Sequence, residues 1–188
     1  MPDHPKAQKP PSRPRRELAY AALGVLAVAV GGRLDVPMVP VPMSLQTYAV
    51  GVVGGLAGPR RGGAILGLYL AAGALGAPVF ADGAGGVGHL TGPTAGYLLG
   101  FALAAVGVGA LAERGWMSTA RGAFAAMALG HVLVLGLGAA WLAAVTDPAT
   151  AYRGGFEPFL LGAAVKSALA AATVRAVKAR TIPPAPDL

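Results

Sequence analysis

Long apolar segments, separated by short polar or glycine- and proline-containing stretches, make up most of the sequence. Six of these segments are candidates for membrane-spanning helices, because a helix needs roughly 17–25 apolar residues to cross the hydrocarbon core of a bilayer. Three are shorter than that range, which leaves their exact ends open. The pattern predicts an all-α membrane protein, a compact bundle of six transmembrane helices. The segments are Leu18–Gly32, Ser44–Gly58, Gly62–Gly76, Thr94–Ala112, Gly122–Thr146 and Pro158–Val177.

Basic residues gather on one side of this predicted bundle. If the N-terminus is cytoplasmic, the outer segments contain only Arg33 and Arg153, and Lys166 alone lies within a span. Lysine and arginine favour the cytoplasmic side of a membrane. We therefore predict that both termini are cytoplasmic. The basic residues assigned to that side are Lys6, Lys9, Arg13, Arg15, Arg16, Arg60, Arg61, Arg114, Arg121, Arg175, Lys178 and Arg180.

Composition narrows the class of protein. The chain has 188 residues, of which 55% are hydrophobic and 12% are charged, whereas soluble domains carry about 25% charged residues. Such a chain lacks the polar groups needed for a water-facing surface, which argues against a soluble enzyme or a disordered scaffold. The net charge of +7 is also typical of proteins that bind nucleic acid. Here the basic residues are explained by their placement on the cytoplasmic side of the membrane, and no nucleic-acid partner is expected.

The chain divides into one helical domain and two tails. We expect residues 1–17 to form a flexible, basic cytoplasmic tail, residues 18–178 to form the transmembrane domain, and residues 179–188 to form a short cytoplasmic tail. The first apolar segment follows basic residues as a secretory signal would. No small-residue cleavage site follows it, so we interpret it as a retained helix. The predicted location is the cell membrane.

Several matches to enzyme motifs fail on context. The G-x-G-x-x-G match at Gly83–Gly88 lies in a predicted outer loop rather than between a strand and a helix. The Gly162–Ser167 segment faintly resembles a phosphate loop, but Leu160 and Val165 stand where that loop requires glycine. Three scattered histidines and no cysteine make no metal site. We therefore expect neither an enzyme with its own ATPase nor a resident metal or cofactor.

Lys166 is the residue least compatible with lipid. It lies roughly 12 Å from the outer end of its predicted helix at 1.5 Å per residue, and the spans contain no acidic residue to pair with it. An ionisable group at that depth is a hypothesis of function, because burying it costs several kcal/mol. The simplest partner is the carboxylate of a ligand. The alternative is a lysine bonded to backbone carbonyls or extended to the interface.

Other polar groups are predicted at similar depth. Together with Lys166 they resemble a small-molecule site, with apolar walls and a few convergent polar groups. Each of them alone is more often an interhelical hydrogen bond or an interface anchor, and for His131 the structural and ligand-facing interpretations are equally good. The candidate binding residues are Gln46, Thr47, Thr94, Tyr97, His131 and Lys166.

The segment between the first two spans is unusually apolar for an outer loop. Its three prolines disfavour helix and favour an extended conformation. An apolar outer loop has something to cover, and we expect it to form a lid over the pocket; Pro78–Phe80 supplies a second apolar flap. The candidate lid residues are Val36, Met38, Val39, Val41 and Met43.

Four motifs carry a family resemblance. V-P-V-P-M-S-L-Q-T at Val39–Thr47 resembles the V-P-I-T-x-Q-T signature of the BioY family, and G-P-R-R-G at Gly58–Gly62 resembles its G-P-R-x-G turn. A-L-G-A-P-V-F at Ala74–Phe80 is similar to its G-x-x-G-x-P-V-F segment, and G-P-T-A-G-Y-L at Gly92–Leu98 to its G-P-T-G-G-Y-L. The resemblance covers roughly residues 18 to 178.

This resemblance implies a function. BioY proteins are the biotin-binding S components of energy-coupling-factor (ECF) transporters. It implies high-affinity capture of biotin from outside. We expect the carboxylate of biotin to meet Lys166 and its polar ring to meet Gln46, Tyr97 or neighbouring residues. It also implies import with a membrane coupling (T) component and a cytoplasmic ATPase pair. Two alternatives stay open: an S component for another vitamin, and a membrane assembly subunit that binds no ligand.

The last helix departs from the family pattern at one position. The family commonly reads P-F-x-x-G-D-x-x-K there, whereas this chain keeps the lysine and has Ala163 in the acidic position. Lys166 then depends more on the ligand for a counter-charge.

Overall fold

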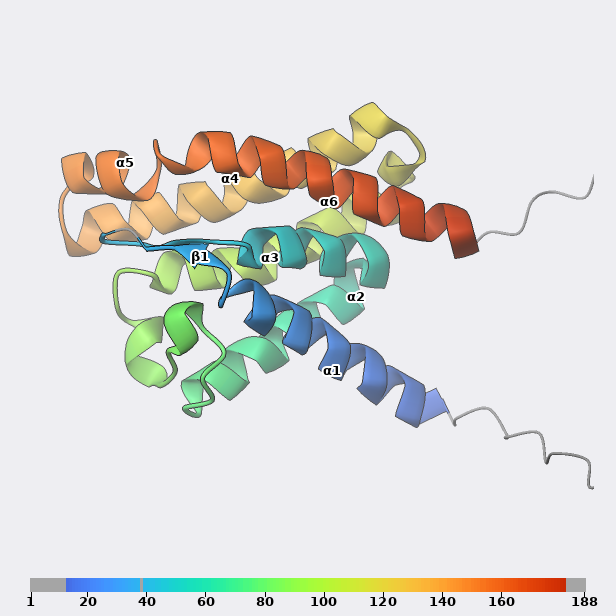
Figure 1. Cartoon of the computed structure of the whole chain (residues 1–188), viewed down its shortest axis with the longest axis horizontal. Coiled ribbons are helices and arrows are strands. Elements are labelled where there is room, and N and C mark those ends of the chain that lie inside the picture. The colour runs from blue at the N-terminus through green and yellow to red at the C-terminus, as the bar shows by residue number, and fades with distance from the viewer. Residues whose placement is uncertain (1–12, 38, 182–188) are drawn as a thin grey trace, which may run out of the picture.

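The computed structural model describes residues 13–37 and 39–181; the predictions for the first twelve and last seven residues and for Met38 lie outside the described part. Helices make up most of it, and Figure 1 shows them gathered into one bundle in which α4 and α6 run alongside each other. The helices are α1 (Arg13–Gly31), α2 (Gln46–Ala74), α3 (Ala95–Glu113), α4 (Ala120–Val145), α5 (Pro148–Gly155) and α6 (Phe159–Thr181). Between them lie strands β1 (Asp35–Val36) and β2 (Met43–Ser44) and the short 3₁₀ turns η1 (Ala81–Gly83), η2 (Val87–Leu90) and η3 (Trp116–Ser118).

The helix named α2 is a hairpin made of two helical halves. Gly58 interrupts it with φ 80° and ψ 175°, a conformation that side chains with a Cβ rarely adopt, and Pro59 follows. The two halves run back along each other, since a Cβ placed on Gly62 would lie 3.3 Å from Cα of Gly54. The halves correspond to the predicted second and third spans, which the structure joins by one tight turn rather than by a separate loop.

Small residues bring the helix backbones together. A Cβ added at Gly54 would lie 2.6 Å from the carbonyl oxygen of Ala105 on α3. Close approach of this kind is how helices associate in lipid, where packing replaces the hydrophobic effect. The missing side chain of Gly54 therefore lets the backbones of α2 and α3 pack directly against each other.

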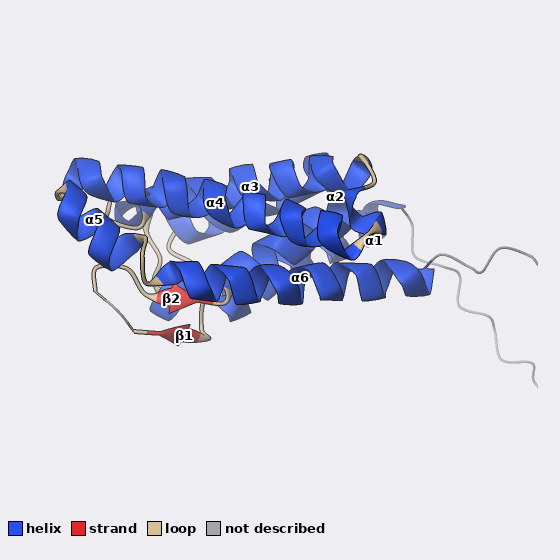
Figure 2. Ribbon diagram, turned by 90° about the horizontal axis from the view of Figure 1, so that it is seen from above, coloured by secondary structure: helices blue, strands red, loops and turns tan. Residues whose placement is uncertain are grey.

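Both described ends of the chain lie at the same end of the bundle. In Figures 1 and 2 the start of α1 and the end of α6 lie together, and the two strands and α5 lie at the opposite end. The first helix begins at Arg13 rather than at Leu18, and α6 continues to Thr181, so both helices extend beyond the boundaries expected for the spans.

The end of the bundle that holds the strands is the more irregular one. Strands β1 and β2 pair antiparallel, with Asp35 opposite Ser44 and Val36 opposite Met43. The short helix α5 was not predicted from the sequence, which placed its residues in an outer loop. Its start is nevertheless encoded locally, because Asp147 accepts hydrogen bonds from the amides of Ala149 and Thr150 and Pro148 occupies the first turn.

Three helices are long and apolar enough to cross a membrane on length and composition alone, within the described residues. They are Ala95–Glu113, Ala120–Val145 and Phe159–Arg180. The first helix carries arginines at its start, and α2 contains a kink flanked by Pro59 and Arg60. The described helices therefore support the all-α prediction and three of the six predicted spans by this measure.

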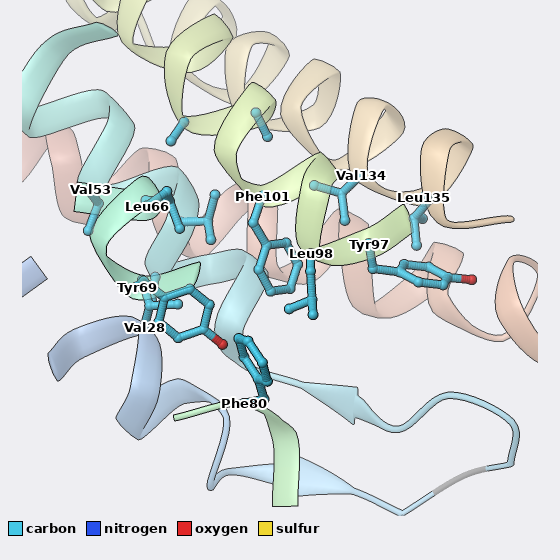
Figure 3. Close-up of a cluster of buried hydrophobic side chains, with 14 of the residues drawn as sticks. Val28, Val53, Leu66, Tyr69, Phe80, Tyr97, Leu98, Phe101, Val134 and Leu135 are labelled. Atoms are coloured by element: carbon cyan, nitrogen blue, oxygen red, sulfur yellow. The ribbon is translucent and has the colours of Figure 1, made fainter. Parts of the chain in front are cut away.

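The main hydrophobic core lies between α2, α3, α4 and the loops beside the strands. Figure 3 shows its aromatic members, with Phe101 and Tyr97 from α3, Tyr69 from α2, and Phe80 approaching from the loop after α2. Tyr69 is fully buried, and its ring meets Phe80 edge-on at a centroid distance of 5.6 Å. This geometry is a favoured one for aromatic pairs. The core thus anchors the loop after α2 as well as the helices.

The close contact at Gly54 predicts a difference between two substitutions, one in each half of α2. Gly54→Ala should destabilise the protein by about 1–3 kcal/mol, because overpacking a tight contact forces backbone shifts. Gly67→Ala, where an added Cβ has nothing within 4 Å, should be neutral or stabilising, because alanine is the better helix former. Thermal unfolding of both variants in detergent measures this. Equal midpoints for the two would contradict the packing role of Gly54.

Candidate ligand-binding cavity

A cavity of about 370 Å³ lies at the end of the bundle that holds the strands. Its wall combines residues of α2, α3, α4 and α6 with residues of the β2 region and of the loop between α2 and α3. The volume falls in the range of about 300–1,000 Å³ typical of small-molecule sites. Most of the lining is apolar, with a few polar groups between the aromatic and aliphatic side chains.

Residues far apart in the sequence converge on this cavity. All six candidate binding residues line it, although they come from four different helices and the residue that precedes one of them. The six residues that the sequence predicts to lie together therefore do lie around one cavity. The residues are Gln46 and Thr47 on α2, Thr94 and Tyr97 at the start of α3, His131 on α4 and Lys166 on α6.

Lys166 is buried, with 7% of its surface exposed, and its Nζ donates to the backbone carbonyl of Ser44 at 2.9 Å. This contact is the carbonyl-bonded arrangement that the sequence left open. An ammonium carries three donors, so two remain for other acceptors. Lys166 forms no ion pair with a described residue. The ion pair found within 4 Å among these residues joins Arg61 to Glu17, at the opposite end of the bundle. Lys166 thus faces the cavity as a cation without a carboxylate beside it.

Gln46 is held by the protein itself. Its Nε2 donates to the hydroxyl of Tyr69 at 2.6 Å, and that hydroxyl donates to the carbonyl of Val79 at 3.1 Å. Its Oε1 accepts from the Ser44 hydroxyl at 3.1 Å. These bonds join the two halves of α2 to the following loop. The amide of Gln46 lines the cavity while its polar atoms are already engaged.

Tyr97 is similarly engaged. Its hydroxyl donates to the carbonyl of Gly155 at the end of α5 at 2.6 Å. Figure 3 shows this hydroxyl directed away from Leu98 and Phe101, at the far end of the Tyr97 ring. The ring is therefore part of the cavity wall, and the hydroxyl ties α5 to α3. Thr94 stands at the N-cap position of α3 without a side-chain capping bond.

His131 and Thr47 present polar atoms that the protein does not engage. The Nδ1 atom of His131 lies 3.1 Å from the carbonyl of Met127 and 2.9 Å from the hydroxyl of Ser167. Its Nε2 atom and the Oγ1 atom of Thr47 are buried without a hydrogen-bond partner. Both side chains line the cavity, so these two atoms are available to a bound molecule.

The candidate lid residues divide into two groups. Val41 is buried and lines the cavity, and Met43 is half-buried and packs against the main core. Val36 and Val39 are exposed to 58% and 92% and face away from the core. Met38 lies outside the described residues. The paired strands have only two residues each, and Val39 and Val41 lie in the connection between them. Which apolar side chains of this segment turn inward is therefore not given by its composition.

Sequence reasoning did not single out every residue of the cavity wall. Tyr69 lies behind the wall and accepts a hydrogen bond from Gln46, and this contact depends on the hairpin of α2, which brings together positions 23 residues apart. Phe80 was assigned to a flap and is nearly fully buried at 2% exposure in the cavity wall. Ala163 also lines the cavity, so the departure from the family pattern lies at the site itself. Asp82 lies in the lining of the same cavity.

A family model described as the BioY family matches residues 6–182 of the chain. The chain belongs to the BioY family. One relative is a probable biotin transporter BioY from Pyrococcus horikoshii, 32% identical over 82% of this chain and 91% of its own length. Another is the biotin transporter BioY from Rhizobium etli, 33% identical over 86% of this chain and 92% of its own length.

A solved structure confirms the fold of this BioY chain. It is described as the S-component for biotin from an ECF-type ABC transporter and matches with a TM-score of 0.77 at 25% identity. The match covers 92% of this chain and 95% of the other. Together with the three long apolar helices, the family identifies the chain as a multi-pass membrane protein with an S-component fold and not as an enzyme.

Two carboxylates lie close together beside the mouth of the BioY cavity. Burial of Asp35 raises the pKa of its carboxyl above the ordinary value, and a hydrogen bond with Asp82 and the charge of Asp82 raise this pKa further. The Oδ2 atom of Asp35 has no partner. The pKa of Asp35 is higher in the folded than in the unfolded protein. The contribution of this carboxyl to the stability of the fold is therefore fully present below its unfolded pKa, and it is lost as the pH rises through its folded pKa.

This pair predicts a pH-dependent effect of Asp82→Asn. The amide can donate to Asp35 without the repulsion, and asparagine tolerates the φ of 55° at this position. The midpoint of thermal unfolding should rise relative to the unsubstituted protein at neutral pH, where both carboxyls are ionised. The gain should shrink as the pH falls through the raised pKa of Asp35 and its carboxyl becomes protonated.

Glu157→Gln, at an exposed carboxylate between α5 and α6, serves as the control and should show no such pH dependence. A gain for Asp82→Asn that is constant with pH would contradict the coupling of the two carboxylates.

Proposed function

We propose that this BioY chain binds biotin in the cavity described above and serves as the substrate-binding component of an ECF-type transporter. The observation that carries the proposal is the convergence of the six polar residues on one cavity of suitable size in a chain of this family. Biotin is the transported ligand and not a cofactor.

The chemistry of the cavity suits biotin. The ligand combines an apolar bicyclic ring and aliphatic chain with a polar ureido group and a carboxylate. The aromatic walls at Phe80, Phe101 and Phe159 suit the apolar part. The two donors of Lys166 that Ser44 does not use suit the carboxylate, because hydrogen bonds between charged groups are roughly twice as strong as neutral ones.

The orientation of the protein follows from its charges. The two halves of α2, with α1, α3, α4 and α6, make the six spans, and both termini are cytoplasmic. Arg61 and the basic residues at the end of α6 then lie on the cytoplasmic side, as the positive-inside rule requires. The cavity opens outward, and residues 36–43 form the lid through which biotin enters.

Energy for transport comes from other subunits. A phosphate loop requires a strand followed by a glycine-rich loop and a helix, whereas residues 162–167 lie inside the helix α6. A membrane coupling (T) component and a cytoplasmic ATPase pair therefore supply the driving force.

The direct test is to identify what the protein carries. Mass spectrometry of small molecules released from gently purified protein should find biotin, and calorimetry in detergent should measure its binding. A thermal-shift panel of other vitamins should give no comparable stabilisation. If a different vitamin stabilises the protein instead, that vitamin and not biotin is the ligand. If no ligand binds at all, the result favours a membrane assembly subunit.

A substitution of Lys166 tests the site within the function. Lys166→Met keeps the aliphatic length and removes the charge, and should weaken biotin binding by about 1.5–3 kcal/mol, the range for hydrogen bonds to charged groups. In calorimetry this corresponds to roughly 10- to 150-fold in Kd. Arg175→Met, at an exposed position of the same helix, is the matched control and should leave Kd unchanged. Unchanged affinity for Lys166→Met would remove Lys166 from the site.

A further inference from the structure

The imidazole of His131 has a defined hydrogen-bonding state. Its side chain is 5% exposed, and its Nδ1 atom lies 3.1 Å from the carbonyl oxygen of Met127. A carbonyl oxygen can only accept, so Nδ1 carries the hydrogen. The Ser167 hydroxyl at 2.9 Å then accepts from the same N–H. Because a neutral imidazole has one donor and one acceptor, its Nε2 atom presents a lone pair.

This lone pair has no donor in the protein. Nε2 of His131 is buried and unpartnered, and so is the hydroxyl of Thr47 in the same cavity. The two residues also border a smaller space below the main cavity, together with Val134 and other apolar side chains. Leaving a buried acceptor without a donor costs about 1–3 kcal/mol. A ligand with an N–H group removes that cost.

The neighbouring polar groups do not present a buried, unpartnered acceptor to a ligand. Gln46 and the hydroxyl of Tyr97 are engaged with protein partners. Lys166 only donates, and Ala163 supplies no polar atom to the cavity wall. The carboxylate of Asp82 also lines the cavity, but that residue is exposed to solvent. Among the described residues of the lining, the buried acceptor without a partner is therefore the Nε2 atom of His131, and the Thr47 hydroxyl is buried and unpartnered in the same cavity.

We infer that His131 is a specificity-determining residue that accepts a hydrogen bond from an N–H of the ligand. This inference rests on the proposed function, in which the ligand is biotin. The ureido ring of biotin has two N–H donors and lies against His131 and Thr47. The carboxylate lies at Lys166, which provides donors. The cavity thus distinguishes a cyclic urea from a ring of the same shape that lacks the N–H.

The test compares biotin with its two carbamate analogues, in each of which a ring oxygen replaces one ureido N–H. Calorimetry on the full chain in detergent measures all three ligands. The unsubstituted protein should prefer biotin over at least one analogue by at least about tenfold, because a site built to bond an N–H rejects a ligand without it. In His131→Leu this preference should disappear, and in His131→Gln, whose amide oxygen accepts, it should return in part.

Lys166→Met is the matched control for the other end of the ligand. It should weaken biotin and the analogues by the same factor and leave the preference intact. If biotin binds but His131→Leu keeps the preference, the inference is overturned while the proposed function stands; this is also the result if Nε2 holds only a water molecule. If the unsubstituted protein binds no biotin, the proposed function itself fails.

A second measurement does not depend on any variant of His131 folding. In ¹⁵N-histidine-labelled protein, the Nε2 resonance of His131 should move upfield when biotin binds, as an accepted hydrogen bond requires, and should move less with the analogue that is rejected. The chain has three histidines, so His4→Gln and His89→Gln assign the signals. An Nε2 resonance that biotin leaves in place would overturn the inference.

Discussion

The hydrogen-bond chain from Gln46 through Tyr69 to the carbonyl of Val79 holds the ligand end of this protein together. It joins the first half of α2, the second half of α2 and the loop that follows. In an apolar interior each of these polar atoms needs a partner, since an unsatisfied buried group costs about 1–3 kcal/mol. Tyr69 is fully buried, so the chain closes the hairpin at the same place where Phe80 enters the cavity wall. The shape of the cavity depends on it.

The same requirement divides the polar groups of the cavity into two kinds. Gln46 and Tyr97 use their polar atoms to tie helices and loops to one another. Lys166, His131 and Thr47 keep donors or a lone pair directed at the cavity. A site that presents a cation and a neutral acceptor within apolar walls suits a ligand with an anionic end and an N–H end. Whether a polar residue ties the protein together or faces the ligand therefore depends on which hydrogen bonds it already makes, and not on its residue type.

Much of the fold was predictable from the sequence. The long apolar segments predicted the positions of the helices, including the two halves of α2, because a helix that crosses a bilayer needs a long apolar stretch. Helix α5 was missed because its eight residues are polar and short, although Asp147 and Pro148 form a recognisable helix start. The exposed side chains of Val36 and Val39 were grouped with the lid, because apolar composition does not say which residues of an irregular segment turn inward.

The sequence by itself determined the class of protein, the family and six of the residues that line the cavity. Low charge, apolar length and four short motifs suffice for these, because each is a local property of the chain. Only the tertiary structure decided which polar atoms are engaged and which are free. The contact of Tyr69 with Gln46 and that of His131 with Ser167 link positions 23 and 36 residues apart. Such contacts depend on how the helices pack, and no local pattern encodes them.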